Sequence, residues 1–266
     1  MISRNSKANL LAVFLILVSI AIAVGIYSYR KHLINTKINL DKESLCNVDG
    51  ASAYHVILID NSEVYTPIQK ADIKKRLNIL IKGIKTNELI SFFIVNDQSL
   101  TSLEPIFSKC KIRDGQNAND LIENRKKIVQ KKKRKFDDPL GELIEMITSK
   151  NKASKTSPIF EMVQAVSVFG FPFEKESQAV PKKLFIFSDL LHNTKDFSLY
   201  KASYNKDFFW RSDYFNEVKT NLTGVEVKIN ILRNKSQKIK ELVIFWETLL
   251  RRYYNAKSIE FERIQG

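Results

Sequence analysis

The 266-residue sequence has few cysteines and histidines, the side chains that zinc sites and many acid–base catalysts require. It contains two cysteines and three histidines, and neither Cys46 nor Cys110 lies in a CxxC or CxxH spacing that would indicate zinc. The GxSxG, P-loop and HExxH motifs are absent. One histidine, His192, follows a predicted strand, where a solvent-exposed loop position is the expected environment. The sequence therefore predicts a protein that is not an enzyme, and it indicates no catalytic residue.

One uncharged stretch near the N terminus is long enough to cross a membrane. Residues 8–29 (ANLLAVFLILVSIAIAVGIYSY) carry no charged side chain, and about 20 apolar residues span the hydrocarbon core of a bilayer. A secretory signal peptide would have a shorter apolar region and a cleavage site of small residues. The sequence therefore predicts a single-pass membrane protein with a transmembrane helix at residues 8–29.

The charges that flank this stretch do not decide its orientation. Basic residues lie on both sides of it, with Arg4 and Lys7 before it and Arg30, Lys31 and Lys37 after it. A short charged tail before an uncleaved apolar segment is typical of an anchor that exports the chain that follows. Cys46 and Cys110 form one disulfide if that chain faces an oxidising compartment, and are two unrelated thiols if it does not. We expect a bacterial inner-membrane protein whose soluble domain is extracytoplasmic.

Composition also divides the rest of the chain. The expected parts are an N-terminal tail (1–7), the transmembrane helix (8–29), a juxtamembrane linker (30–53), an α/β domain (54–254) with a basic insertion (113–150), and a C-terminal tail (255–266). Domains usually have roughly 100–200 residues. The chain therefore has room for one ordinary domain and its appendages.

Two apolar runs that end in polar residues predict the fold. HVILID at residues 55–60 continues into Asn61 and Ser62, and KLFIFS at residues 183–188 continues into Asp189. Short apolar runs of this kind are typical of parallel strands that are buried on both faces. Ligand sites in such sheets lie beyond the carboxyl ends of the strands, so Asp60 and Asp189 should share one rim. The predicted fold class is α/β, with a doubly wound, mostly parallel sheet preceded by one transmembrane helix.

The remaining elements are predicted from periodicity and capping. Thr66 and Pro67 indicate one helix start, and Ser157 as N-cap with Pro158 at the first helical position indicates another. Further expectations are strands at 88–95 and 225–232, the second near an edge, a weaker extended piece at 103–107, a last helix at 239–253, and an aromatic segment at 204–215 that either covers a sheet face or forms an exposed patch.

The order of these motifs resembles the von Willebrand factor A family. Over about residues 54–254, a strand is followed by Asp-x-Ser, a helix begins at Ser-Pro, a strand is followed by Ser-Asp, and a terminal helix contains Phe245 and Trp246. Members of the family have a doubly wound fold with a metal-ion-dependent adhesion site on the rim, where an open coordination position binds a carboxylate of a partner protein. The resemblance implies Mg²⁺ or Mn²⁺ as cofactor, an acidic protein partner, and a ligand set of Asp60, Ser62, Ser157 and Asp189, with Thr66 and Thr156 as further candidates.

The first motif departs from the family pattern at one position. The family has Asp-x-Ser-x-Ser, whereas Val64 replaces the second serine and has no oxygen for a metal. Glu63 and Thr66 are nearby oxygen donors, although neither is in register. Two interpretations stay open: a metal site of carboxylates and hydroxyls, and a degenerate site in which Asp60 and Ser62 only cap loops.

A run of basic residues lies in the predicted insertion. The whole chain is also basic, with a net charge of +14 and a pI of about 9.6, which favours an anionic partner such as nucleic acid, acidic lipid or an acidic protein surface. Such runs usually form a solvated helix face, and without interleaved aromatics this one does not predict a stacking platform for single-stranded nucleic acid. The candidate anion-binding residues are Arg125, Lys126, Lys127, Lys131, Lys132, Lys133, Arg134 and Lys135.

These observations favour a membrane-anchored, von Willebrand A-like protein-interaction module. The alternative is a membrane-tethered factor that binds nucleic acid or anionic lipid through residues 125–135. A phosphoester hydrolase is the third interpretation, because haloacid-dehalogenase-like phosphatases also place an Asp after a strand. They require a second acid two residues later, where this chain has Ser62.

Overall fold

The computed structural model describes residues 4–35, 39–116, 118, 123–149, 153–171, 180–200, 209–232 and 239–264. The chain divides into two compact units, Met1–Leu40 and Asp41–Gly266. The boundary falls inside the segment that the sequence assigns to a linker.

The first unit is built on one helix, α1 (Arg4–Asn35). Its segment Leu10–Tyr29 has a mean hydropathy of 2.9, and none of it is buried against protein. At a rise of about 1.5 Å per residue, about 20 residues reach about 30 Å, the thickness of the hydrocarbon core of a bilayer. This helix supports a membrane anchor at the N terminus.

The second unit contains a six-stranded sheet in the order β3-β2-β1-β4-β5-β6. The strands are β1 (Ala53–Asp60), β2 (Glu88–Val95), β3 (Phe107–Cys110), β4 (Lys182–Ser188), β5 (Val225–Ile231) and β6 (Ser258–Arg263). All neighbouring pairs are parallel except β2 and β3. This arrangement confirms the predicted doubly wound, mostly parallel α/β class, and it is consistent with a von Willebrand A-like or Rossmann-like fold.

Helices and single helical turns connect the strands. They are α2 (Pro67–Gly83), η1 (Ser99–Thr101), α3 (Arg125–Lys132), η2 (Lys133–Asp137), α4 (Asp138–Ser149), α5 (Ile159–Ala165), η3 (Val166–Gly170), α7 (Asp213–Val218), α8 (Ile239–Thr248) and η4 (Leu249–Tyr253). The turns η2, η3 and η4 are π-helical and continue the helices before them.

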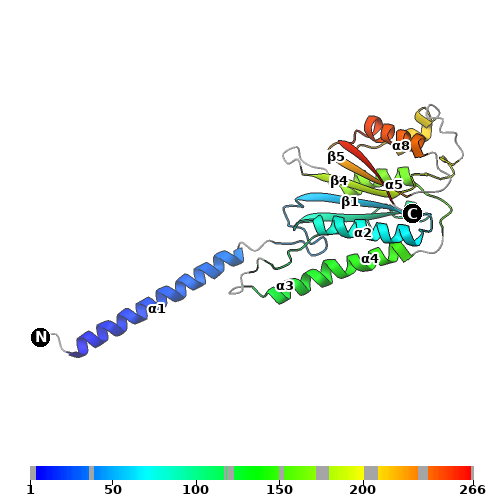
Figure 1. Cartoon of the computed structure of the whole chain (residues 1–266). Helices are drawn as coiled ribbons and strands as arrows, with labels where there is room; N and C mark the ends of the chain where they lie inside the picture. The colour runs from blue at the N-terminus through cyan, green and yellow to red at the C-terminus, as the bar shows by residue number, and fades with distance from the viewer. Residues whose placement is uncertain are drawn as a thin grey trace. The chain divides into compact units, whose positions relative to one another are not determined.

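The helices cover the sheet from both sides. We call the side that carries α2 and α4 the α2–α4 face, and the side that carries α5, α7 and α8 the α5–α8 face (Figure 1). Along β1, Val56 and Leu58 pack on the α5–α8 face, whereas Ile57 and Ile59 pack on the α2–α4 face. Because side chains alternate between the faces of a strand, burial on both faces accounts for the unbroken apolar run at residues 55–60.

One predicted helix start is confirmed and the other is wrong. Thr66 caps α2 with a capping box, in which its hydroxyl accepts the Gln69 N–H and the Gln69 side chain accepts the Thr66 N–H. Ser157 does not cap α5, because Pro158 is the residue before the first turn. Ser157 instead forms a β-bridge with Asn193, and its hydroxyl serves a carboxylate, as described below.

Three expectations about segment boundaries are wrong. The third strand is Phe107–Cys110 and not residues 103–107. Residues 113–150 are not simply a basic insertion, because α4 packs on the α2–α4 face through Leu140, Leu143, Ile144 and Ile147. Residues 255–266 are not only a tail, because β6 pairs with β5 and makes β6 the edge strand. The alternating charges of SIEFER at residues 258–263 suit an edge but conceal the strand.

Two further features fix the surroundings of the sheet. A disulfide joins Cys46, in the segment before β1, to Cys110, the last residue of β3. The aromatic segment covers the α5–α8 face, since Phe209 and Phe215 are buried in its core. Tyr204 and Phe208, which belong to the same prediction, lie outside the described residues.

Candidate functional site

The candidate site lies where β1 and β4 end side by side. Ile59 is in register with Phe187 in the parallel pair, so the next residues, Asp60 and Ser188, reach the same rim of the sheet. The third contributor is Ser157, just before α5. Parallel pairing therefore brings together residues that are about 130 positions apart in sequence, as the sequence predicts for Asp60 and its partners on the rim.

Hydrogen bonds from three segments meet at the carboxylate of Asp60. Ser188 donates its hydroxyl to Asp60 Oδ2 at 2.7 Å, and the Ser157 hydroxyl lies 3.3 and 3.2 Å from the two oxygens. The main-chain N–H of Ser62 donates to Oδ1 at 3.0 Å. Tyr65 donates its hydroxyl to the main-chain oxygen of Asp60. The side chain is thus held in one orientation by β1, β4 and the loop before α5.

Burial makes the charge of Asp60 costly. The residue is 4% exposed, and it forms no ion pair with any described residue. Burial raises the pKa of its carboxyl, while the hydrogen bonds from Ser62, Ser188 and Ser157 lower it. The pKa of the Tyr65 hydroxyl is raised well above its usual value by burial and by the charges of Asp60 and Asp189. The carboxylates of Asp60 and Asp189 are therefore both close enough to Tyr65 to affect its ionisation.

A small hollow opens beside this carboxylate. Its volume is about 20 Å³, which is room for about one water molecule or a small ion. The residues that line it include three acids and no lysine or arginine: Asp60, Ser62, Glu63, Val64, Tyr65, Gln69, Asp189 and Leu232. In a chain with a net charge of +14, an acidic lining of this kind favours a cation.

The predicted ligand residues occupy different positions around the hollow. Asp60, Ser62 and Asp189 line it, whereas Ser157 does not line it and donates its hydroxyl to Asp60. Thr66 caps α2, and Thr156 is half-buried and does not line the hollow. Val64 lines the hollow and is exposed, so the family position that it occupies supplies no oxygen.

The donor set is of the kind that a hard cation takes. Within the described ranges there is no group of three or more His, Cys, Asp or Glu residues that could enclose a metal. Magnesium usually takes one or two carboxylates in proteins and retains several waters. Two carboxylates and a serine hydroxyl are ligands of that kind, and a hollow with room for about one water molecule or a small ion leaves the remaining waters of the ion outside it.

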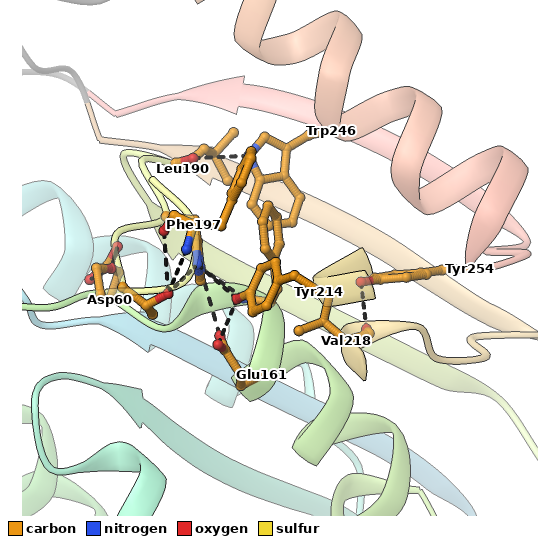
Figure 2. Close-up of polar contacts among 12 residues, drawn as sticks. Asp60, Glu161, Leu190, Phe197, Tyr214, Val218, Trp246 and Tyr254 are labelled. Carbon is orange, nitrogen blue, oxygen red and sulfur yellow. Dashed lines mark hydrogen bonds and ion pairs between the residues drawn. The ribbon is translucent and has the colours of Figure 1, made fainter. Parts of the chain in front are cut away.

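The loop that carries Asp189 is held in an unusual conformation. Leu190 has a φ of 66°, a left-handed value that costs a bulky residue free energy. Its main-chain N–H donates to the Ser188 hydroxyl at 2.8 Å, and its main-chain oxygen accepts the Trp246 indole N–H at 3.0 Å (Figure 2). Contacts from β4 and α8 thus fix the backbone immediately after Asp189.

A buried polar network supports the same loop, and the sequence analysis missed it. His192, predicted to be exposed, is completely buried and stacks on Phe160 with 4.2 Å between ring centroids. Its Nε2 lies 2.9 Å from the Tyr214 hydroxyl, which donates to Glu161 at 2.6 Å. Figure 2 shows the Tyr214 side chain directed at Glu161. The two leucines that precede His192 in sequence were a signal that this part of the loop turns inward.

The hydrogen bonds assign one protonation state to this network. The Phe160 N–H donates to His192 Nδ1 at 3.5 Å, so the ring proton lies on Nε2 and faces the tyrosine oxygen. Burial lowers the pKa of His192 to about 3 and raises that of Glu161. A neutral histidine therefore links the Asp189 loop to α5 and α7.

The predicted basic segment is separate from this set of contacts. Its residues lie on α3 and η2, and α3 has no buried residue. Lys132 pairs with Asp137 at 2.7 Å, and Phe136 is the side chain that turns into the core. The segment has the exposure expected of a solvated helix face, and anion binding there stays a prediction.

Comparisons with known proteins give little beyond this geometry. No family model matches the chain, and no curated protein matches it. Among solved structures, it is similar to the conserved hypothetical protein BatB from Bacteroides thetaiotaomicron, with 9% identity, a TM-score of 0.40, and coverage of 80% of this chain and 91% of that one. It is also similar to an aerotolerance-related membrane protein from Bacteroides fragilis, with 9% identity, a TM-score of 0.35, and coverage of 79% and 92%. At these values neither likeness assigns a function.

Proposed function

We propose that the chain is a membrane-anchored, von Willebrand A-like protein-interaction module whose rim binds Mg²⁺ or Mn²⁺ and, through it, a carboxylate of a partner protein. The observation that carries the proposal is the buried carboxylate of Asp60, which hydroxyls orient and no described basic side chain neutralises. An isolated buried charge is unfavourable. A divalent cation in the adjoining hollow would remove that cost.

Some residues of the site would be ligands of such an ion, and others position those ligands. Asp60 and Asp189 would supply charge, and Ser62 would supply a neutral oxygen, since all three line the hollow. Ser157 and Ser188 position the Asp60 carboxylate by donating to it. The bound cation would supply the positive charge that a partner's carboxylate recognises. Because Val64 supplies no ligand, water would occupy more of the coordination sphere, and we expect weak binding.

The anchor and the disulfide support a location outside the cytoplasm. The Cys46–Cys110 bond ties the segment before β1 to β3, and such bonds persist in oxidising compartments. The chain enters the sheet at the start of β1, whereas Asp60 lies at the end of that strand. The site is therefore at the carboxyl end of β1, and the segment before β1 enters at the amino end of the same strand.

The test is calorimetric titration of Mg²⁺ and Mn²⁺ into the detergent-purified full chain and into two variants, Asp60→Asn and Asp189→Asn. We expect saturable binding by the wild-type chain and its loss in both variants, because each removes a charge from the lining of the hollow. The matched control is Asp49→Asn, an exposed carboxylate in the segment before β1, which should bind the ions as the wild type does.

Absence of binding in the wild-type chain would contradict the proposal. Equal binding by the wild type and by Asp60→Asn would place the ion elsewhere and would contradict it as well. Thermal unfolding of each variant in EDTA checks that the substitutions leave the fold intact.

A second function, anion binding by the basic segment, is favoured by the exposure of α3. Its affinity for a polyanion such as heparin should fall steeply with salt concentration and should be indifferent to EDTA. Replacement of Lys126 and Lys127 by Gln would weaken it, whereas Asp60→Asn would not.

A further inference from the structure

One part of the sheet lacks a helical cover on the α2–α4 face. On β4, Leu184 and Ile186 are completely buried on the α5–α8 face, whereas Phe185, on the opposite face, is only half-buried. The same contrast holds on β5 between Ile229 and Lys228. Parallel sheets are normally covered on both faces. Among the described residues, α2 reaches this side of the three strands beside Phe187, Asn230 and Glu262, and it leaves Phe185 and Lys228 half-buried.

The uncovered area forms a groove beside α2. Its volume is about 510 Å³, and its lining comes from one flank of α2 and from β1, β4, β5 and β6. The apolar part of the lining consists of Ile79, Leu80, Ile84, Phe185 and Phe187. None of the residues that line the rim hollow lines this groove. It is therefore a second, independent feature of the same domain.

The flank of α2 that borders the groove has the residue spacing of a helix–helix contact. Ile68, Asp72, Lys75 and Ile79 follow one another at intervals of four, three and four residues. Ile68 is 61% exposed and Ile79 is 62% exposed, although the opposite flank of the same helix packs on the sheet through Ile73 and Leu77. Asp72, Lys75 and Ile79 of this stripe line the groove, and a stripe with charged residues between exposed isoleucines suits contact with an amphipathic helix.

One end of the groove is fixed by a charged cluster. Arg76 pairs with Asp72 on its own helix and with Glu262 on β6, and it also donates to the main-chain oxygen of Arg263. Lys228 shares Glu262. These residues bridge α2 to the far strands, so an occupant lies against the other end of the groove, beside Ile79 and Gly83. A Cβ built on Gly83 meets no atom within 4 Å.

The charge of the lining indicates the chemistry of the occupant. Four lining residues are basic, namely Lys75, Arg76, Lys183 and Lys228, and two are acidic, namely Asp72 and Glu262. Two of the basic groups are unpaired or only loosely paired. Lys75 forms no ion pair with the described residues, and the one ion pair that Lys183 forms with them is to Glu226, at 4.0 Å. The groove thus offers an apolar floor with lysines at its border.

We propose that this groove binds an amphipathic helix of a partner protein, with apolar residues against Ile79 and Phe185 and acidic residues toward Lys75 and Lys183. A helix beside α2 would supply the missing cover of the parallel sheet. Its apolar side chains would fill the groove, and its acidic side chains would form ion pairs with Lys75 and Lys183. The geometry is that of a helix laid in a groove and read through side chains on one face.

The test uses displayed peptide pools as the probe and the full chain in nanodiscs as the target. Each pool contains helical peptides of about 16 residues, or about 24 Å, with the same apolar stripe and either glutamate or lysine on the flanks. We expect enrichment from the acidic pool alone. An enriched peptide should lose about tenfold or more in affinity for Ile79→Glu and for Lys183→Glu, because each places a like charge where the peptide lies.

The matched control is Ile244→Glu, an exposed isoleucine of α8 on the other face. It should bind the peptide with unchanged affinity, and because Ile79 and Ile244 are both exposed, neither variant is expected to unfold. Failure of both pools to enrich would overturn the proposal, as would enriched peptides that bind Ile79→Glu as tightly as the wild type. Displacement of an environment-sensitive dye by dodecanoate but by no peptide would assign the groove to a small lipid-like anion and would overturn it also.

Discussion

Two polar clusters on one sheet differ in how their charges are balanced. At the rim, Asp60 is buried among serine hydroxyls and no described base reaches it. On the α2–α4 face, Arg76 is held by Asp72, Glu262, the Asn230 side chain and the Arg263 main-chain oxygen. The first cluster has an excess of charge and adjoins a hollow. The second satisfies its charges within the chain.

The carboxyl groups of the two clusters show this difference in their pKa values. Burial raises the pKa of Asp60, whereas hydrogen bonds from Lys228 and Arg76 lower the pKa of Glu262. A carboxylate that its own fold destabilises is suited to an external cation, and one that its fold stabilises is a structural element. The predictions below separate these roles, beginning with the largest effect.

Removal of Arg76 should break the balanced cluster. Arg76→Ala removes a donor from Asp72 and from the buried Asn230 side chain and leaves Glu262 with Lys228 alone, so we expect a loss of about 2 kcal/mol in the free energy of unfolding. Urea unfolding at pH 7, followed by tryptophan fluorescence, measures it. Cation binding at the rim should be unchanged.

The control for Arg76 is Arg251→Ala, which removes an exposed i,i+4 pair with Glu247 and should cost well under about 1 kcal/mol. Equal losses for the two variants would mean that the Arg76 cluster is no more than a surface ion pair.

As the pH is lowered, the protein should lose stability through His192, which supports the Asp189 loop at the rim, before it loses stability through the Arg76 cluster. The pKa of His192 is about 3 in the folded protein and about 6.5 in the unfolded chain. Between these values the unfolded state binds more protons, so stability falls as the pH is lowered from 6.5 toward 3. We expect a loss of about 2 kcal/mol between pH 6.5 and pH 4.5, and His192→Gln should remove this part of the slope in urea unfolding.

His55→Gln is the comparison for that slope. Burial lowers the pKa of His55, but its bond to Glu88 raises it again, so its removal should change the slope less. The inference that His192 is buried and neutral fails if the two variants change the slope equally.

Neutralisation of Asp60 should increase the free energy of unfolding, whereas the loss of Arg76 should decrease it. Because the folded pKa of Asp60 is raised, its ionised form opposes folding at pH values above that pKa. Asp60→Asn should therefore raise the free energy of unfolding at pH 8 in EDTA. The gain should shrink as the pH falls toward the unfolded value of about 4.

Added Mg²⁺ should make the wild type more stable than Asp60→Asn, because the ion stabilises the wild type by mass action and does not stabilise the variant. A lower stability of Asp60→Asn at pH 8 in EDTA would show that the fold favours the ionised carboxylate and would remove the contrast between the two clusters.

Substitutions on α3 should have the smallest effect on stability, because the charged side chains of this helix are solvated by water. Replacement of Lys126 and Lys127 by Gln should change the free energy of unfolding by less than about 0.5 kcal/mol, as measured in urea. A larger loss would mean that these side chains contact the rest of the domain.

The sequence predicted those elements whose burial is uniform along the chain. Strands β1 and β2 are buried on both faces or nearly so, and their apolar runs were recognised with boundaries close to those observed. The short edge strand β6 was missed, because its Glu260, Glu262 and Arg263 resemble a solvated tail. The helix α4 was missed because its apolar stripe directly follows the charge run at residues 125–135, which resembles a solvated segment.

The candidate site was predicted only where a local pattern places a residue. Asp60 and Asp189 follow strands directly, so the direction of a parallel sheet was enough to bring them to one rim. Ser188 is the last residue of β4 and was not named, although its hydroxyl makes the 2.7 Å bond to Asp60. The network of His192, Tyr214 and Glu161 joins three segments, and no local pattern encodes such a contact.

The sequence by itself determined the apolar N-terminal helix, the class of the sheet and the rim on which the carboxylates lie, because each follows from local hydrophobic patterns and strand direction. Only the tertiary structure decided which charges are balanced. The partners of Arg76 are up to 187 residues away, and the position of Asp60 among hydroxyls depends on β4 and the loop before α5. The cost of a buried charge is set by what surrounds it in space, and that is a property of packing which no single segment of the sequence contains.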